Sequence, residues 1–124
     1  MNVLVVDDQP CVADSLALFL RTLGNDCFVA READEADRIL ERQLIDALIV
    51  DVNMPGRTGL QWLESLESLR PELLRRTLVI TGARLQVEDR RRLSGWGAGL
   101  LTKPFPADRL LEAFQRQVSW SGDC

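Results

Sequence analysis

The sequence predicts an α/β fold: a doubly wound (βα)5 unit in which one five-stranded parallel sheet carries helices on both faces. Short apolar runs alternate with segments of helical period along the chain, which is typical of repeated βαβ units. The apolar runs are continuous and do not alternate with polar residues, as expected for strands buried on both faces. A chain of 124 residues is close to the commonest size of a single domain. We expect one domain over residues 1–119 and a short tail, residues 120–124.

Five apolar runs are the predicted strands, at residues 2–6, 27–30, 47–50, 77–80 and 99–102. A helix between the first two strands is predicted from four apolar residues at helical spacing, with Gly24 and Asn25 as its end. Those four residues are Val12, Leu16, Phe19 and Leu23. The later helices are predicted at residues 32–43, 59–69, 86–95 and 107–118, each with apolar residues on one side.

Two of the later helices have a clear packing face. In the helix at 59–69, Leu63 and Leu66 form an apolar stripe, and Arg70-Pro71 marks the expected end. The last helix has an acidic residue, Asp108, near its start, where the helix dipole favours it. Its apolar residues are Leu110, Leu111, Phe114 and Val118.

The helix at 86–95 has a much thinner apolar face. Only Leu85, Val87 and Leu93 are expected to face the core, because residues 88–92 are continuously charged. We predict that this helix is the least firmly anchored of the five. Its basic run, "DRRRL", is interpreted as a solvated helix face.

Composition limits the functions that the chain can have. Hydrophobic residues make up 46% and charged residues 27%, with a net charge of -4, which is typical of a soluble globular protein. The acidic balance argues against a nucleic-acid surface in this chain, because phosphate backbones attract clusters of Lys and Arg. The chain contains no histidine, which excludes Ser-His and Cys-His nucleophile pairs. Any chemistry must therefore use carboxylates, Lys, Thr or a metal.

The sequence also predicts where the protein resides. Met1 is followed by the strand-like "NVLVV" and not by a charged leader with a long apolar region. No run approaches the roughly eighteen apolar residues expected of a membrane helix. The three cysteines lack CxxC spacing, so neither a disulfide framework nor a zinc site is predicted. We expect a cytoplasmic protein without a membrane partner.

Polar residues follow four of the predicted strands at the point where each strand ends. Asp7 and Asp8 follow the first strand, Asp51 follows the third, Thr81 the fourth and Lys103 the fifth. A simple interpretation is that each begins a solvated loop. However, the carboxyl ends of parallel strands meet at one edge of the sheet, where such folds bind ligands. The coincidence of these residue types at one edge favours a shared site.

The chemistry of this set suits a phosphoryl group. Three carboxylates in one crevice repel one another, and a divalent cation, a lysine or proton uptake relieves that repulsion. Mg²⁺ prefers such oxygen ligands, and Lys103 adds one positive charge. A carboxylate in this environment is a competent nucleophile toward phosphorus and would form an aspartyl phosphate. Thr81 offers a hydroxyl to the transferred group, and the small Gly82 leaves the backbone beside it exposed.

The same residues carry a family resemblance. The segments "VVDD", "DVNMPGRTG", "VITG" and "GAGLLTKPF" stand in the order and approximate spacing of one family. Over essentially its full length, the chain resembles the response-regulator receiver domain of two-component signalling, in the CheY-like superfamily. The resemblance implies a flavodoxin-like strand order, 2-1-3-4-5.

The resemblance also implies a role for each site residue. Asp51 would be the phosphoacceptor, and Mg²⁺ would be the cofactor. The implied protein ligands of Mg²⁺ are Asp8, Asp51 and the backbone carbonyl of Asn53, with Asp7 acting through water. Thr81 would be the switch hydroxyl and Lys103 the cation that pairs with the phosphate. Lys103-Pro104 would be a cis peptide, which is the minority state of X-Pro bonds.

The implied function is a phosphorylation-dependent switch, not an enzyme that turns over substrate beyond its own phosphorylation and autodephosphorylation. The implied partners are a sensor histidine kinase or histidine phosphotransfer protein, and an output domain or protein; a dimer linked to phosphorylation is also compatible. Phosphorylation would change the face made by residues 86–95, 99–102 and 107–118. One departure is Leu100, because the family often has Tyr or Phe there. We therefore expect the signal mainly at 86–95, with a small rotamer response at Leu100.

Three alternative functions compete with this interpretation. A Mg²⁺-dependent phosphatase or phosphotransferase of the haloacid dehalogenase type would place a second acid two residues after the nucleophile, where Asn53 stands. A flavin binder would need Ser, Thr or Gly in its phosphate loop, where "DDQPCVADS" places acids. A pseudo-receiver, acting as a non-phosphorylated interaction module, would not need the intact acid set.

Overall fold

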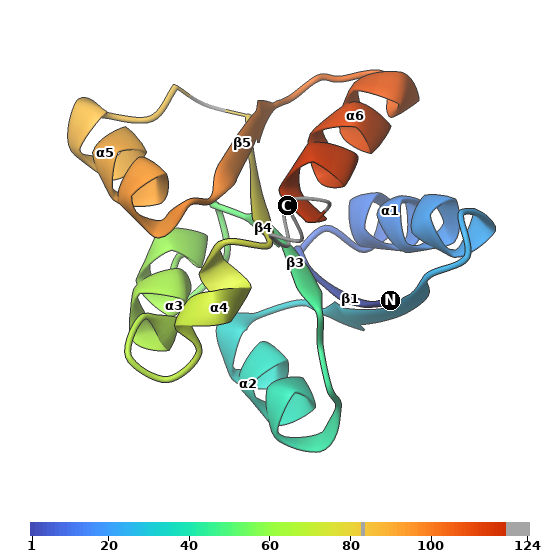
Figure 1. Cartoon of the computed structure of the whole chain (residues 1–124), viewed down its shortest axis with the longest axis horizontal. Helices are drawn as coiled ribbons and strands as arrows, with labels where there is room; N and C mark the ends of the chain where they lie inside the picture. Colours follow the sequence, from blue (N-terminus) through green and yellow to red (C-terminus); the bar gives the residue numbers. More distant parts are fainter. Residues whose placement is uncertain (83, 119–124) are drawn as a thin grey trace, which may run out of the picture.

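The computed structural model describes residues 1–82 and 84–118. Its five strands form one parallel sheet in the order β2-β1-β3-β4-β5, which confirms the predicted fold class and strand order (Figure 1). The strands are β1 Asn2–Val6, β2 Asp26–Ala30, β3 Ala47–Asp51, β4 Thr77–Thr81 and β5 Gly99–Thr102. The helices are α1 Pro10–Thr22, α2 Ala33–Arg42, α3 Gly59–Leu66, α4 Pro71–Leu74, α5 Val87–Trp96 and α6 Ala107–Val118. The predicted tail, residues 120–124, lies outside the described residues.

Helices cover both faces of the sheet, which explains why its strands are continuously apolar. Helices α1 and α6 pack on one face, and α2, α3, α4 and α5 pack on the other (Figure 1). Successive residues of a strand point to opposite faces. In β1, for example, Val3 and Val5 join the core beneath α1 and α6, while Leu4 and Val6 join the core on the other side. All five residues of the central strand β3 are buried, including Asp51.

The segment after α3 differs from the prediction. Helix α3 ends at Leu66, three residues before the expected end, and Pro71 begins a short additional helix, α4. Proline is well suited to the first position of a helix, because its fixed φ is helical and its missing N–H would have had no partner there. The Arg70-Pro71 pair thus separates two helices instead of separating a helix from a strand.

The buried face of α1 matches the prediction in part: Leu16 is buried, and Val12 and Phe19 pack against the same core. Its fully buried residues are Ala13, Leu16, Ala17 and Leu20. The expectation for Leu23 was wrong: α1 ends at Thr22, and Leu23 is 44% exposed. Small alanines occupy half of the actual face, and a pattern based on large apolar residues overlooks them.

Helix α5 has a single fully buried side chain, Leu93, fewer than any other helix in the described part of the chain. Val87 was expected to face the core but is 62% exposed. It lies six residues before Leu93, and a helix of about 3.6 residues per turn places these two residues on different faces. Arg90 and Arg91 are exposed, as expected for a solvated face.

Arg92 does not fit the prediction of a solvated basic run. Its guanidinium group lies 2.9 Å from a carboxylate oxygen of Glu64 on α3, and it sits 5.4 Å from the centre of the Trp96 ring. An arginine over an aromatic face gains a cation–π attraction in addition to its ion pair. Helix α5 is therefore held to α3 by an ion pair of Arg92, while Leu93 anchors the helix in the core.

Candidate functional site

The predicted site residues meet at the carboxyl edge of the sheet. Asp7 follows β1, Asp51 ends β3, Thr81 ends β4 and Lys103 follows β5. Backbone hydrogen bonds extend the sheet just past its strands: the Asp7 N–H donates to the Ala30 carbonyl (3.0 Å) and the Lys103 N–H to the Thr81 carbonyl (2.8 Å). The positions of these residues are therefore set by the sheet and not by a loose loop.

The acidic cluster consists of Asp7, Asp8 and Asp51. Each residue offers a carboxylate oxygen, and these oxygens all lie within 4.8 Å of one another. Asp7 and Asp51 are buried, with 1% and 5% of their surface exposed, while Asp8 is exposed. The site therefore opens to solvent on the side of Asp8.

Lys103 partly compensates the charge of this cluster. Its Nζ lies 3.7 Å from Asp51 Oδ2 and 3.9 Å from Asp7 Oδ2. With all three carboxyls ionised, three negative charges face one positive charge, and a net charge of -2 remains. A divalent cation would balance this remainder.

Burial at this edge changes the acidity of Asp7. Burial, and secondarily the negative charge of Asp51, raise the pKa of Asp7 from 3.8 to about 6, against the opposing effects of the Gln9 N–H and Lys103. The Gln9 N–H donates to Asp7 Oδ1 (2.9 Å), whereas Asp7 Oδ2 is buried without a hydrogen-bond partner. A buried carboxylate oxygen without a donor is costly. A cation, or a water bound to one, would satisfy it, so the residues present fit a hard divalent metal such as Mg²⁺.

The loop after Asp51 returns to the end of β3, where the Gly59 N–H donates to the Val52 carbonyl (2.9 Å). The Asn53 N–H donates to Asp51 Oδ1 (3.2 Å), which orients the carboxylate. Helix α3 then begins with a capping box, in which the Thr58 hydroxyl accepts from the Gln61 N–H and the Gln61 side chain accepts from the Thr58 N–H. Gly59 allows the close approach, because a Cβ at this position would collide with the backbone carbonyl oxygen of Asp51.

Thr81 and Lys103 complete the edge. Thr81 is 1% exposed and is paired in register with Thr102 on β5. The Lys103-Pro104 peptide is cis, as predicted. Leu100, at the position where the family often has an aromatic residue, is half-buried and packs against the core that also contains Leu93.

Three residues near the site were missed by sequence reasoning. Gly59 permits the approach of α3, while Arg57 and Trp62 make side-chain contacts with α2. A signal for Gly59 was present, because Thr58 and Gln61 form a capping-box pattern that places Gly59 at the first turn of a helix. The partners of Arg57 and Trp62 left no such signal, because they depend on how two helices are rotated.

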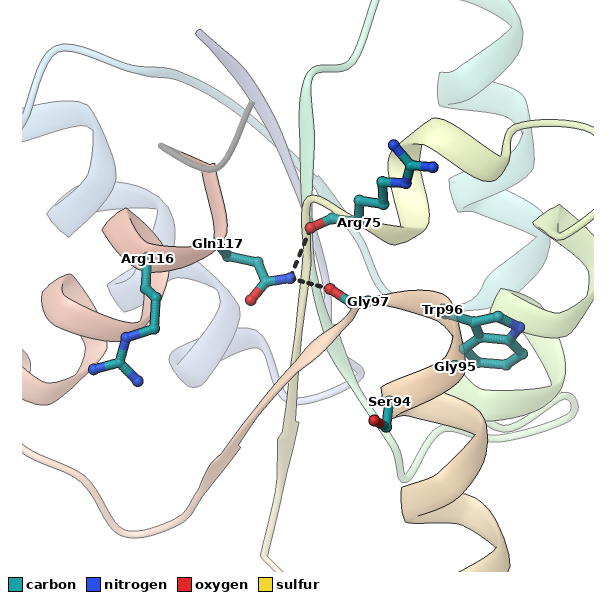
Figure 2. A pocket seen from close by; sticks show the side chains of 7 residues that line it. All are labelled: Arg75, Ser94, Gly95, Trp96, Gly97, Arg116 and Gln117. Carbon is teal, nitrogen blue, oxygen red and sulfur yellow. Dashed lines mark hydrogen bonds between the residues drawn. The ribbon is translucent and has the colours of Figure 1, made fainter. Parts of the chain in front are cut away.

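A cavity of about 340 Å³ lies at the opposite edge of the sheet, near the amino ends of β4 and β5. Its lining includes Arg75, Trp96, Arg116 and Gln117 (Figure 2). Gln117 Nε2 donates to the carbonyl oxygens of Arg75 (2.7 Å) and Gly97 (2.6 Å), and so ties the end of α6 to the segments that precede β4 and β5. The two arginine side chains point away from each other in this view. None of the three acids of the cluster lines this cavity.

Comparison with known proteins identifies the class of domain. A family model for the response regulator receiver domain matches residues 3–115, and the chain belongs to this family. Its members generally bind Mg²⁺ at an acidic cluster and interact with histidine kinases and output domains. In this chain the corresponding cluster is Asp7, Asp8 and Asp51.

Individual relatives agree with this assignment. The chain is 33% identical over 112 residues to TcrX of Mycobacterium tuberculosis, a probable transcriptional regulatory protein, covering 90% of this chain and 47% of TcrX. A CheY-like receiver domain from Methanospirillum hungatei has a TM-score of 0.85 and 25% identity, over 95% of this chain and 93% of that one. TrrA of Thermotoga maritima, solved in complex with Mg²⁺ and BeF, has a TM-score of 0.78 and 26% identity, over 94% and 97%.

The chain spans about half the length of TcrX and a quarter of a second relative, the hydrogenase transcriptional regulatory protein HoxA of Cupriavidus necator. The activities and partners of those whole proteins are thus not carried over with the domain. Across the described residues, no helix combines the length and the apolar character needed to cross a membrane.

Proposed function

We propose that this receiver domain is a phosphorylation-dependent switch that accepts a phosphoryl group on Asp51 in the presence of Mg²⁺. The main support is the buried Asp51 carboxylate at the end of the central strand, 3.7 Å from the Lys103 ammonium and next to two further acids. The complex of TrrA with Mg²⁺ and BeF supports the same chemistry in a relative of the same fold.

The proposed transfer needs no proton from Asp51. An oxygen of the ionised carboxylate forms a bond to phosphorus while the phosphorus–nitrogen bond of a phosphohistidine donor breaks, and the electron pair of that bond stays on the imidazole nitrogen. The Lys103 ammonium would pair with a phosphoryl oxygen, and the Thr81 hydroxyl would bond another. Because these groups lie at one edge before the donor arrives, catalysis is mainly positioning and charge stabilisation.

The metal would be held by the carboxylates of Asp8 and Asp51 and by the backbone carbonyl of Asn53, with Asp7 bound through water. When bound, Mg²⁺ would neutralise charge on the transferring phosphoryl oxygens. The side chains of the site supply the rest: Asp7 and Asp8 would attract the cation, and Lys103 is paired with Asp51.

We further propose that the phosphoryl group alters the face made by α5, β5 and α6, which then contacts an output domain or protein. The single buried residue of α5 supports this, since elements that switch come from the less stable parts of a structure. The phosphate would come from a sensor histidine kinase or a histidine phosphotransfer protein in the cytoplasm. The domain would turn over no substrate other than its own phosphate.

A phosphorylation assay separates this function from its rivals. The protein is incubated with acetyl phosphate, with Mg²⁺ or with EDTA, and its intact mass is measured. A switch gains one phosphoryl group only with Mg²⁺ and does not turn over phosphomonoesters. Sustained turnover of phosphomonoesters would indicate a phosphatase, and the absence of any adduct with acetyl phosphate or with a phosphorylated histidine donor would indicate a pseudo-receiver.

A further inference from the structure

The β3–α3 loop, defined here as residues 52–58, is fastened to helix α2 by one side chain. Arg57 Nη2 lies 2.9 Å from Asp34 Oδ1 and 2.7 Å from Asp37 Oδ2. Both acids raise the pKa of the Arg57 guanidinium, with the Asp37 hydrogen bond as the larger cause. In the described residues, the two ion pairs of Arg57 are the only ones that link this loop to another element.

Asp37 is itself held in place by the core. Its Oδ1 accepts a hydrogen bond from Trp62 Nε1 (2.8 Å), and Trp62 on α3 is fully buried. A buried indole N–H needs an acceptor, and Asp37 satisfies it. One carboxylate therefore connects α2, α3 and the loop. Because Trp62 orders the Asp37 carboxylate beforehand, the ion pair with Arg57 costs less side-chain entropy than an ordinary surface pair.

The loop has few other restraints between its two ends. Asn53, Pro55 and Gly56 are exposed, and Met54 is the one fully buried side chain in the loop. Gly56 adopts a positive φ of 75°, which glycine reaches without the strain that a side chain would impose. Asn53, whose carbonyl is a proposed metal ligand, thus lies between the end of the sheet and the Arg57 contact.

We propose that Arg57 is a positioning residue for the metal site: by fastening the β3–α3 loop to Asp34 and Asp37, it holds the Asn53 carbonyl where it can bind Mg²⁺. This inference rests on the proposed function, because it assigns the loop to a Mg²⁺ site. Arg57 touches neither the metal nor the phosphoryl group in this role.

Loss of the Arg57 charge and loss of its hold on the loop should have opposite effects on Mg²⁺ binding. Because like charges repel, removing the positive charge of Arg57 would, by electrostatics alone, strengthen cation binding. Releasing the loop would weaken it. Asp37→Asn reverses the sign of the charge effect: it removes a negative charge and the stronger of the two ion pairs of Arg57, but leaves an amide oxygen to accept from Trp62. If Arg57 positions the loop, both variants should bind Mg²⁺ more weakly than wild type. If only the charge mattered, Asp37→Asn alone would bind it more weakly.

The test uses MgCl₂ titrations of the whole chain, followed by the backbone amide NMR signals of Asp8 and Asn53. We expect Arg57→Ala to weaken Mg²⁺ binding about three- to tenfold, given two partly exposed ion pairs. The double variant, Arg57→Ala with Asp37→Asn, should bind Mg²⁺ no more weakly than the weaker-binding single variant, because both substitutions remove the same Arg57–Asp37 contact. The matched control is Arg38→Ala, an exposed arginine next to Asp37 on α2, which should stay within about twofold of wild type.

A second readout does not depend on metal. In the metal-free protein, Arg57→Ala should shift the Trp62 indole N–H signal, assigned with Trp62→Phe, and speed amide exchange in the loop. Unchanged or tighter Mg²⁺ binding by Arg57→Ala, or a loss equalled by Arg38→Ala, would overturn the positioning role while leaving the proposed function intact. Failure of the wild-type protein itself to respond to Mg²⁺ would instead remove the proposed function, and the inference with it.

Discussion

The ammonium nitrogen of Lys103 lies 3.7 Å from a carboxylate oxygen of Asp51, across the gap between the ends of β5 and β3. Strand β4, which ends in Thr81, lies between them in the sheet. Lys103 and the proposed nucleophile Asp51 thus come from the two strands on either side of β4, and the Thr81 hydroxyl comes from β4 itself. The space among these three groups is where a phosphoryl group on Asp51 would be stabilised.

Lys103→Met should slow phosphorylation by acetyl phosphate about 10- to 100-fold, because it removes one fixed charge that stabilises the transferring group. Mg²⁺ binding should persist, since the acids remain. Intact-mass spectrometry measures the rate of phosphorylation, and a Mg²⁺ titration measures metal binding. A wild-type rate in this variant would rule out the proposed role of Lys103.

Asp7 should make the metal-free protein less stable as the pH rises. The pKa of the Asp7 carboxyl rises from its usual value of 3.8 to about 6 in the folded protein. The folded chain therefore holds the carboxyl proton more tightly than the unfolded chain does. The stabilising contribution is fully present below pH 4 and is lost as the pH rises through 6. Asp7→Asn should therefore be the more stable protein at pH 7.5, by on the order of 2 kcal/mol, with the difference shrinking toward pH 4. Urea unfolding in EDTA at several pH values measures this, and a difference that does not vary with pH would contradict it.

Asp8→Ala should separate metal binding from stability. Removing one acid from the cluster relieves repulsion, so the melting temperature without metal should stay the same or rise. The increase caused by Mg²⁺ should largely disappear, since a ligand stabilises only the state that binds it. Thermal melts with and without Mg²⁺ provide both values. An undiminished Mg²⁺-induced increase would exclude Asp8 as a ligand.

Helix α5 should respond most strongly to a phosphoryl mimic. Beryllofluoride with Mg²⁺ is expected to change amide hydrogen exchange over residues 86–95, with only a small rotamer change at Leu100. Arg92→Ala should speed exchange in α5 before the mimic is added, because it removes the contacts with Glu64 and Trp96. Arg91→Ala is the control, since Arg91 is exposed. Unchanged exchange over 86–95 while other surfaces respond would exclude this route for the signal.

The sheet and its acidic edge could be predicted because both depend on local pattern. Continuous apolar runs mark the buried strands, and the polar residue that ends each run falls at the same edge of any parallel sheet. The contacts of Arg57 and Arg92 could not be predicted in this way, because they depend on how neighbouring helices are rotated about their axes. Helix α4 was missed for a different reason: a single turn is too short to show a period.

The phosphorylated residue itself is the most direct test of the central claim. Wild-type protein and Asp51→Asn are treated with acetyl phosphate and Mg²⁺, and the adduct is located by tandem mass spectrometry after borohydride trapping of the acyl phosphate. We predict that the wild-type adduct maps to Asp51 alone and that Asp51→Asn, which keeps the shape of the side chain but lacks the nucleophilic charge, forms none. A full adduct on Asp51→Asn, or a wild-type adduct at Asp7 or Asp8, would contradict the assignment of Asp51 as the phosphoacceptor.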